Sequence, residues 1–287
     1  CHALNTKGGV HSEFTILRES EDSFYLVSAG AYQRLDHDWI HKWMPKDGSV
    51  QFENLTNSMG VLVVAGPKAR ELMKKVSKDD FSNENFKWLS AKNVDVGYAP
   101  VNAMRVNFVG ELGWELHHPI EMQNYLFDLL HSAGEKYDLK WVGARAQNWL
   151  RQEKSYRAFG TELGRDATPL EADLPRFVDM SKDFNGKAQM EKIGIRSKCV
   201  TLLIDGPEDS DPWGREALYA EDGTKRIGRL TSGGYSVVFE KSVAMGYVNP
   251  IFAVEGQKLK VKIQNTLWNA VVTSDSPYDP QNEKLRS

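Results

Sequence analysis

The sequence contains little of what would point to several common classes of protein. Cysteine occurs twice, at Cys1 and Cys199, and neither residue belongs to a C-x-x-C pair. This count argues against a disulfide framework or a cysteine-rich zinc site and favours a reducing compartment. The longest apolar runs, such as GVLVVAG at 60–66, are far shorter than a membrane-spanning helix.

Three sequence signatures of catalysis and nucleotide binding are also missing. No G-x-G-x-x-G follows a strand pattern, and neither G-x-x-x-x-G-K-[ST] nor G-x-S-x-G occurs. Charge of one sign is lacking too, because 36 basic and 39 acidic residues give a net charge of −3. We therefore see no electrostatic case for binding nucleic acid or an anionic membrane.

What remains is a globular composition, with 41% hydrophobic and 26% charged residues in 287 positions. Up to residue 194, helical patterns alternate with short strands, which predicts an α+β fold with antiparallel sheets. From residue 195, short apolar runs alternate with turns, which predicts an all-β barrel or sandwich. Two domains, 1–194 and 195–287, are therefore expected.

Individual elements can be placed from periodicity and turn residues. Strands are expected at 13–18 and 24–28, and an amphipathic helix with one apolar face at 31–44. A second helix is expected over 119–134, with Gly134 at its C-cap. The pair Asp222-Gly223 predicts a β-hairpin in the C-terminal part.

The histidines give little support for a metal. His37 and His41 would share one face of a helix, but no third ligand is evident, so we predict two solvated side chains and no metal. His117 and His118 would point to opposite faces of a strand.

The stretch MRVNFVGELGWEL, residues 104–116, places two glutamates around a glycine-containing turn. This pattern fits a solvated hairpin tip, and it also fits a carboxylate that points into a pocket and holds a ligand. Glu115 and His117 would share one face of the strand, whereas Trp114 would face the other and pack. Glu111 is expected in solvent. From the residues alone, the sequence supports a soluble two-domain protein and nothing more specific.

Seven fragments, taken together, carry a resemblance. They are LNTKGGVHSEFTI, GVLVVAGPKAREL, FVGELGWEL, TPLEADL, DFNGKAQM, IGRLTSGGYS and VAMGYVNP. Their order and spacing resemble the folate-binding half of the aminomethyltransferase (glycine cleavage T-protein) family. The resemblance implies a folate-binding domain over 1–194, lacking its N-terminal part, and the C-terminal β-barrel of that family over 195–287.

Another stretch resembles one branch of the family. LRQEKSYRAFGTEL, residues 150–163, is similar to the E-K-x-[YF]-R-x-[WF]-G version in dimethylglycine and sarcosine dehydrogenases. Those enzymes join a flavin-bearing, amine-oxidising half to the folate half. FAD is therefore expected only in an N-terminal domain missing from this sequence, which would be a piece of a longer polypeptide. The resemblance implies choline degradation in the bacterial cytoplasm or the mitochondrial matrix.

The resemblance also implies roles for single residues. Glu115 matches a pterin-binding glutamate, and a carboxylate can accept the paired donors of a pterin edge. Glu13 matches an aspartate beside the reactive folate nitrogens and is the expected catalytic residue. Arg145 falls where T-proteins place an arginine for the anionic folate tail. Val27, through its backbone, and Tyr235, in the TSGGYS loop, are expected to line the folate site.

The implied function is a tetrahydrofolate-binding one-carbon transfer module. It would capture the iminium methylene from a flavin domain as 5,10-methylenetetrahydrofolate. One alternative is a stand-alone aminomethyltransferase or a dimethylsulfoniopropionate demethylase-like methyltransferase, and another is a non-catalytic folate-binding module. The expected partners are a folate and an N-methyl amine-derived iminium, with no nucleic acid, membrane or metal.

Overall fold

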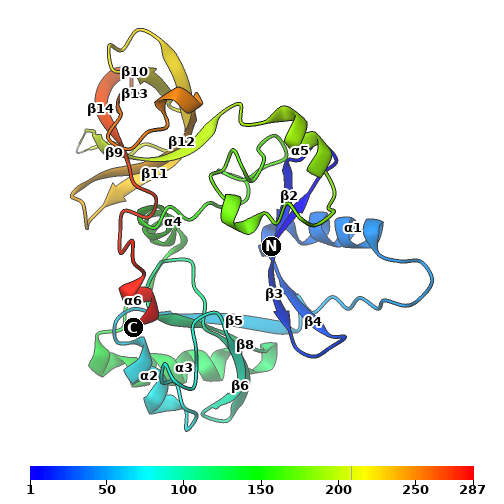
Figure 1. Cartoon of the computed structure of the whole chain (residues 1–287). Coiled ribbons are helices and arrows are strands. Elements are labelled where there is room, and N and C mark those ends of the chain that lie inside the picture. The colour runs from blue at the N-terminus through cyan, green and yellow to red at the C-terminus, as the bar shows by residue number, and fades with distance from the viewer. Residues whose placement is uncertain (208) are drawn as a thin grey trace. The chain divides into compact units, whose positions relative to one another are not determined.

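The computed structural model describes residues 1–207 and 209–287, which form two compact units (Figure 1). Unit 1 comprises Cys1–Val27 and Ala144–Pro280, and unit 2 comprises Ser28–Gly143 and Gln281–Ser287. The chain therefore leaves unit 1 after its first strands and returns to it at residue 144. The domain boundary that the sequence suggests after residue 194 stays a prediction.

Unit 2 is built on a four-stranded antiparallel sheet with the strand order β5-β8-β7-β6. Its strands are β5 (Met59–Ala65), β6 (Ala91–Val96), β7 (Ala99–Met104) and β8 (Gly113–Pro119). Its helices are η1 (Gly30–Tyr32), α1 (Gln33–Trp43), α2 (Ala69–Val76), η2 (Ile120–Met122), α3 (Gln123–Gly134), η3 (Glu135–Tyr137) and α6 (Glu283–Arg286).

The core of unit 2 lies between one face of this sheet and helices α2 and α3. Trp114, on β8, is fully buried there and meets Phe81 edge to face, with ring centroids 5.2 Å apart. Leu126 and Leu130 of α3 are buried in the same cluster. The expectation that Trp114 packs inward is confirmed. Burial of such large apolar side chains is the main source of stability for a unit of this size.

The C-terminal residues are held to unit 2 by a buried arginine. Arg105 follows β7 and is 2% exposed. Its guanidinium donates to the carbonyl oxygens of Phe86 at 2.6 Å, Arg286 at 3.0 Å and Ser287 at 3.1 Å. These acceptors bind the two terminal nitrogens of the buried cation, whereas its Nε has no partner among the described residues, and they fasten α6 to the sheet.

Unit 1 contains a closed barrel with the strand order β10-β11-β12-β9-β14-β13. Its barrel strands are β9 (Lys198–Asp205), β10 (Ala217–Ala220), β11 (Arg226–Ser236), β12 (Lys241–Val248), β13 (Lys258–Ile263) and β14 (Thr266–Thr273). Two antiparallel hairpins precede it, β1 (His2–Leu4) with β2 (Val10–Glu13), and β3 (Thr15–Arg18) with β4 (Phe24–Val27). Its helices are α4 (Ala144–Glu153), η4 (Pro175–Phe177), α5 (Lys187–Ile193) and η5 (Pro250–Phe252).

The predicted fold class, α+β with antiparallel sheets followed by a β-barrel, is confirmed. The strands expected at 13–18 and 24–28 correspond to β3 and β4. Asp222-Gly223 does form the turn between β10 and β11, and Gly223 has a φ of 73°. The Asp222 carboxylate accepts the backbone N–H of Thr224 at 3.0 Å, which is the turn chemistry that favours this residue.

The helix expected at 31–44 is confirmed as α1, on which Trp39 and Trp43 pack on each other and Trp43 is about half exposed. One local prediction was wrong. Gly134 is no left-handed cap, because α3 runs on into η3 and the left-handed residue is Asp138, with a φ of 59°. A Cβ at position 134 would lie 2.5 Å from the side chain of Leu139, so close packing accounts for the glycine.

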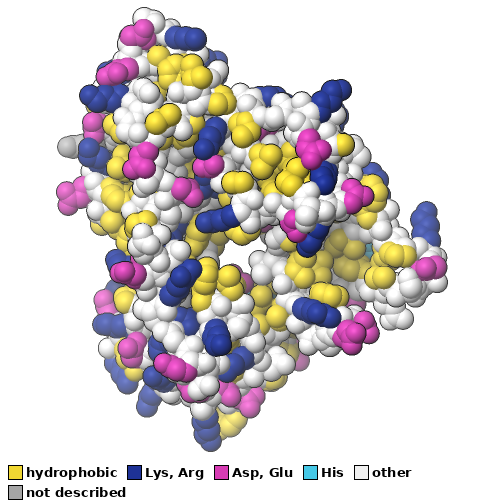
Figure 2. Space-filling model, in the orientation of Figure 1, with side chains coloured by type: hydrophobic (Ala, Val, Ile, Leu, Met, Phe, Trp, Pro, Cys, Tyr) yellow, Lys and Arg dark blue, Asp and Glu magenta, His cyan; other side chains and the backbone are white. Residues whose placement is uncertain are grey.

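The surface agrees with the balanced composition. On the face shown in Figure 2, basic and acidic side chains are interspersed without a large field of one sign. Among the described residues, no helix combines the length and the apolar character that crossing a membrane would require.

Candidate functional site

Glu115 lies on β8 and points away from the buried core of unit 2. In the strand register it stands between Val63 of β5 and Met104 of β7, and its side chain is 23% exposed. Gly113, two residues earlier, has no room for a side chain, because a Cβ there would lie 2.5 Å from the carbonyl oxygen of Val64. The backbone that carries Glu115 is therefore closely paired with β5, which fixes where the side chain leaves the sheet.

His117 is the side-chain partner of Glu115. Its Nε2 lies 3.3 Å from Oε2 of Glu115, and the imidazole is fully buried. In the part of the chain that the structure describes, Oε1 of Glu115 has no hydrogen-bond partner. His118 faces the other side, where Nε2 lies 2.9 Å from Oε1 of Gln123. The expected sharing of one face by Glu115 and His117 is confirmed, and its contribution is one hydrogen bond that orients the carboxylate.

Glu13 and Val27 belong to the first two hairpins of unit 1. Glu13 ends β2, and its side chain is 39% exposed, with Oε1 3.7 Å from Nε2 of His2. Val27 ends β4 and pairs with Thr15, two residues after Glu13. The backbone of Val27 therefore runs beside the segment that carries Glu13.

Arg145 lies in the first turn of α4, where its guanidinium lies over two indole rings. The Cζ atom is 5.2 Å from the ring centroid of Trp149 and 5.2 Å from that of Trp213. Nη2 also lies 3.3 Å from Oδ2 of Asp211, while the Arg145 side chain remains 61% exposed. Cation–π contacts of this kind stabilise an exposed guanidinium without neutralising it.

Tyr235 and Arg145 are linked by Trp149, which contacts Arg145 and the residue before Tyr235. Trp149 lies against Gly234, the residue before Tyr235 on β11, and the Tyr235 side chain is exposed. Four of the five predicted site residues therefore belong to unit 1, as the pair Glu13 and Val27 and the pair Arg145 and Tyr235. Glu115 belongs to unit 2.

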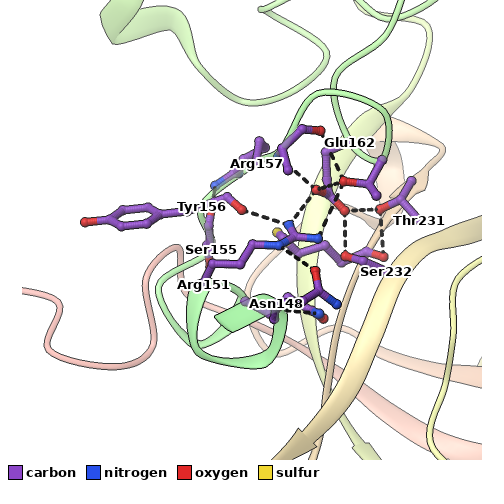
Figure 3. A network of polar contacts seen from close by, with 12 residues as sticks. Asn148, Arg151, Ser155, Tyr156, Arg157, Glu162, Thr231 and Ser232 are labelled. Carbon is purple, nitrogen blue, oxygen red and sulfur yellow. Dashed lines mark hydrogen bonds and ion pairs between the residues drawn. The ribbon is translucent and has the colours of Figure 1, made fainter. Parts of the chain in front are cut away.

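The stretch that resembles the dehydrogenases, RQEKSYR at 151–157, forms a buried polar network instead of an open site (Figure 3). Lys154 donates to the carbonyl oxygens of Tyr278 at 3.1 Å and Asp279 at 2.7 Å. Arg157 donates to the Asp275 carboxylate at 2.6 Å. These contacts fasten the end of α4 to the segment that follows the barrel.

Glu162 is the centre of this network (Figure 3). Its Oε2 accepts from Arg151 at 2.6 Å, and its Oε1 accepts from Thr231 at 2.7 Å and Ser232 at 2.6 Å. Burial by itself raises the pKa of Glu162, but the Arg151 guanidinium and the hydroxyl donors outweigh it and hold that pKa below its usual range. The ionised carboxylate joins α4 to β11.

A pocket of about 630 Å³ lies in unit 1 between the 160–171 segment and strands β11 and β12. In its wall Arg196 binds Glu171 through two hydrogen bonds, at 2.8 and 2.9 Å, and the Tyr247 hydroxyl donates to the carbonyl oxygen of Glu162. Its lining includes none of the five predicted site residues. These engaged groups indicate a mainly structural role for the wall.

His37 and His41 pack together on α1, with ring centroids 4.2 Å apart, and both contact Phe52. Across residues 1–207 and 209–287, no three His, Cys, Asp or Glu side chains gather in a way that could hold a metal ion.

Comparison with known proteins identifies the architecture. The GCVT N-terminal domain matches residues 1–182, and the glycine cleavage T-protein C-terminal barrel domain matches residues 198–279. The chain belongs to the glycine cleavage T-protein family. The resemblance inferred from the seven fragments is thereby confirmed.

Members of the T-protein family match along almost the whole chain. Human mitochondrial dimethylglycine dehydrogenase is 37% identical over 282 residues, which is 96% of this chain and 32% of that protein. An aminomethyltransferase of Caldanaerobacter subterraneus is 29% identical over 98% of this chain and 74% of its own length. The chain thus spans about a third of the dehydrogenase.

A solved T-protein shares the fold. The aminomethyltransferase T of Bartonella henselae superposes with a TM-score of 0.81 at 22% identity, over 97% of this chain and 75% of that protein. At this identity the likeness describes the fold alone.

The side-chain contacts of two predicted site residues, Arg145 and Glu13, were not predicted from the sequence. Trp149 follows Arg145 by four residues, so their contact could have been expected on a helix. Asp211 and Trp213 lie more than sixty residues away in a loop without periodicity, and no local signal joins them to Arg145. The pairing of Glu13 with His2 depends on the register of β1 and β2 in the same way.

Proposed function

We propose that this chain is a tetrahydrofolate-binding one-carbon transfer module of a dimethylglycine or sarcosine dehydrogenase-like flavoenzyme. In this reaction a flavin domain elsewhere in the enzyme supplies an iminium, and the reduced folate takes its methylene as 5,10-methylenetetrahydrofolate. The family and the 37% identity to human dimethylglycine dehydrogenase support the proposal. The relatives are mitochondrial or bacterial, which fits the matrix or the bacterial cytoplasm.

The observation that carries the proposal is the Glu115 carboxylate. It lies on the sheet face opposite the core, is partly shielded from solvent, and is oriented by His117 through one oxygen. Each carboxylate oxygen has two lone pairs, so both can still accept from a ligand. A flat heterocycle with adjacent amino and ring N–H donors matches this acceptor, and a pterin is such a heterocycle.

The other residues would orient the ligand and stabilise charge. Arg145 is exposed and cationic and would bind the anionic end of the folate. Glu13 would stabilise the positive charge of the reacting one-carbon unit, and the Val27 backbone and Tyr235 would line the site. Holding nucleophile and electrophile in a productive orientation can supply several kcal/mol of the barrier.

Calorimetry with 5-formyltetrahydrofolate, a stable reduced folate, tests this function. Glu115→Gln should weaken binding by about 1.5–3 kcal/mol, or roughly 10- to 150-fold, because hydrogen bonds to a charged acceptor are lost. Glu121→Gln, an exposed glutamate on the adjacent η2, removes the same charge and should leave affinity unchanged. Equal affinities for the wild type and Glu115→Gln would remove Glu115 from the site.

A second candidate is a stand-alone aminomethyltransferase or a sulfonium demethylase-like methyltransferase. The match to the Caldanaerobacter aminomethyltransferase over 74% of that protein favours it. The full-length protein separates the two functions. Formation of methylenetetrahydrofolate from dimethylglycine or sarcosine with an electron acceptor supports the dehydrogenase. Transfer that needs no electron acceptor supports the alternative. Tight folate binding without any transfer would indicate a non-catalytic module.

A further inference from the structure

Arg145 and the three residues that contact its guanidinium form a group in unit 1 that we call the Arg145 clamp. Its members are Arg145, Trp149, Asp211 and Trp213. The two indoles lie at equal distances, 5.2 Å, from the guanidinium carbon. A guanidinium in contact with aromatic rings can still donate from its N–H groups, and here one of them, Nη2, donates to Asp211. The two ring contacts therefore limit the positions that the guanidinium can take while leaving it able to bind an anion.

Close packing on β11 builds the clamp. A Cβ at Gly234 would lie 2.0 Å from the Trp149 ring, and a Cβ at Gly233 would lie 2.6 Å from the Pro212 ring. The two glycines of TSGGYS thus let α4 and the loop of Trp213 approach the same strand. The backbone of Trp213 is held as well, because its N–H donates to the Glu216 carboxylate at 2.9 Å.

Asp211 differs from the other three members because it is an anion on the edge of the guanidinium. Its contact is a single one, 3.3 Å from Nη2, and the Asp211 side chain is 24% exposed while Arg145 is 61% exposed. One long, solvent-accessible contact is weak compared with the two parallel hydrogen bonds that a free carboxylate can make to a guanidinium.

We propose that Asp211 is a resident counter-ion that a carboxylate of the ligand displaces from Arg145, and that Trp149 and Trp213 hold the guanidinium ready for the exchange. The inference rests on the proposed function, since it takes the ligand to be a folate with a glutamate tail. Asp211 then sets the selectivity of the site. It disfavours weak or monodentate anions and yields to a carboxylate that binds bidentately.

The inference predicts that removing the competitor tightens binding. Asp211→Asn should raise the affinity for 5-formyltetrahydrofolate about two- to fivefold, the factor that an exposed ion pair contributes. The matched control is Asp209→Asn, an exposed aspartate of the same loop that removes the same charge and should change nothing. Trp213→Ala should weaken binding, because the guanidinium loses its stacking partner.

Two further measurements decide the matter. The gain from Asp211→Asn should vanish in an Arg145→Ala background, and it should vanish with 5-formyltetrahydropteroate, the same ring system without glutamate. If the wild type binds both ligands equally well, Arg145 does not hold the tail and the inference fails while folate binding stands. If the wild type binds neither, the proposed function itself fails. Weaker binding or no change by Asp211→Asn, or an equal gain by Asp209→Asn, also overturns it.

Discussion

The buried Arg151–Glu162 pair allows a quantitative prediction about stability. Glu162→Gln keeps the shape of the side chain but removes its charge and turns one acceptor into a donor. The amide oxygen can replace the carboxylate oxygen that now accepts from the Arg151 guanidinium, the Ala158 N–H and the Thr161 hydroxyl. The amide nitrogen would then face the hydroxyls of Thr231 and Ser232, which can turn to accept. Arg151, 1% exposed, would be left without its anion.

The expected cost follows from that geometry. Breaking a buried ion pair by removing one partner commonly costs about 3–5 kcal/mol, because the remaining charge is buried and uncompensated. Arg151 keeps two neutral acceptors, the Tyr156 carbonyl at 2.8 Å and the Asn148 amide at 3.0 Å, so we expect the lower half of that range, about 3–4 kcal/mol. The double variant Arg151→Met, Glu162→Leu removes both charges and should cost less than Glu162→Gln alone.

Urea unfolding gives the free energies, and hydrogen exchange of β11 amides assigns the loss to unit 1. Lys241→Met is a matched control, because it breaks an exposed pair with Asp205 and should cost about 1 kcal/mol or less. A cost below about 1 kcal/mol for Glu162→Gln would refute the reasoning from burial. A double variant that costs more than the single one would refute the reasoning from the unpaired charge.

Three other outcomes follow from the same structure. The pKa of Glu162 is lower in the folded protein than in the unfolded chain, so the ionised carboxylate stabilises the fold above about pH 4.3, the pKa of an unfolded glutamate. This contribution is lost as pH falls through the folded pKa. Tm should therefore fall more steeply on acidification in the wild type than in Glu162→Gln. Burial raises the pKa of the Cys199 thiol to about 12, so a thiol reagent should label exposed Cys1 in the native protein and Cys199 only after unfolding; rapid native labelling of both would contradict this. Glu13→Ala should slow one-carbon transfer in the full-length enzyme more than it weakens folate binding, and an unaltered transfer rate in single-turnover kinetics would exclude the proposed role.

Features set by neighbouring residues could be predicted from the sequence. Alternation along 113–119 placed Trp114 in the core and Glu115 with His117 on the other face, because side chains of a strand alternate. The Asp222-Gly223 turn follows equally directly from the backbone preferences of its two residues.

Features that depend on distant segments could not be predicted. RQEKSYR consists of polar and charged residues, and it is buried because acceptors from 275–279 and the Ser236 hydroxyl of β11 bind its side chains. Gly134 resembles a helix cap, and packing by Leu139 accounts for it instead. Glu13 and Arg145 were predicted from the family resemblance. Their partners, His2 and Asp211, could be identified only from the folded structure.

The strand order of the barrel has a consequence during synthesis on the ribosome. β9 is the first barrel strand to be made, yet its neighbours are β12 and β14, and β14 ends at Thr273. One edge of β9 thus waits for β12 and the other for the last strand, β14, and one edge of β10 waits for β13. A nascent chain halted between 205 and 258 would expose unpaired strand edges, a known route to aggregation. Nonsense codons in that interval should therefore yield insoluble product, not a shortened working protein.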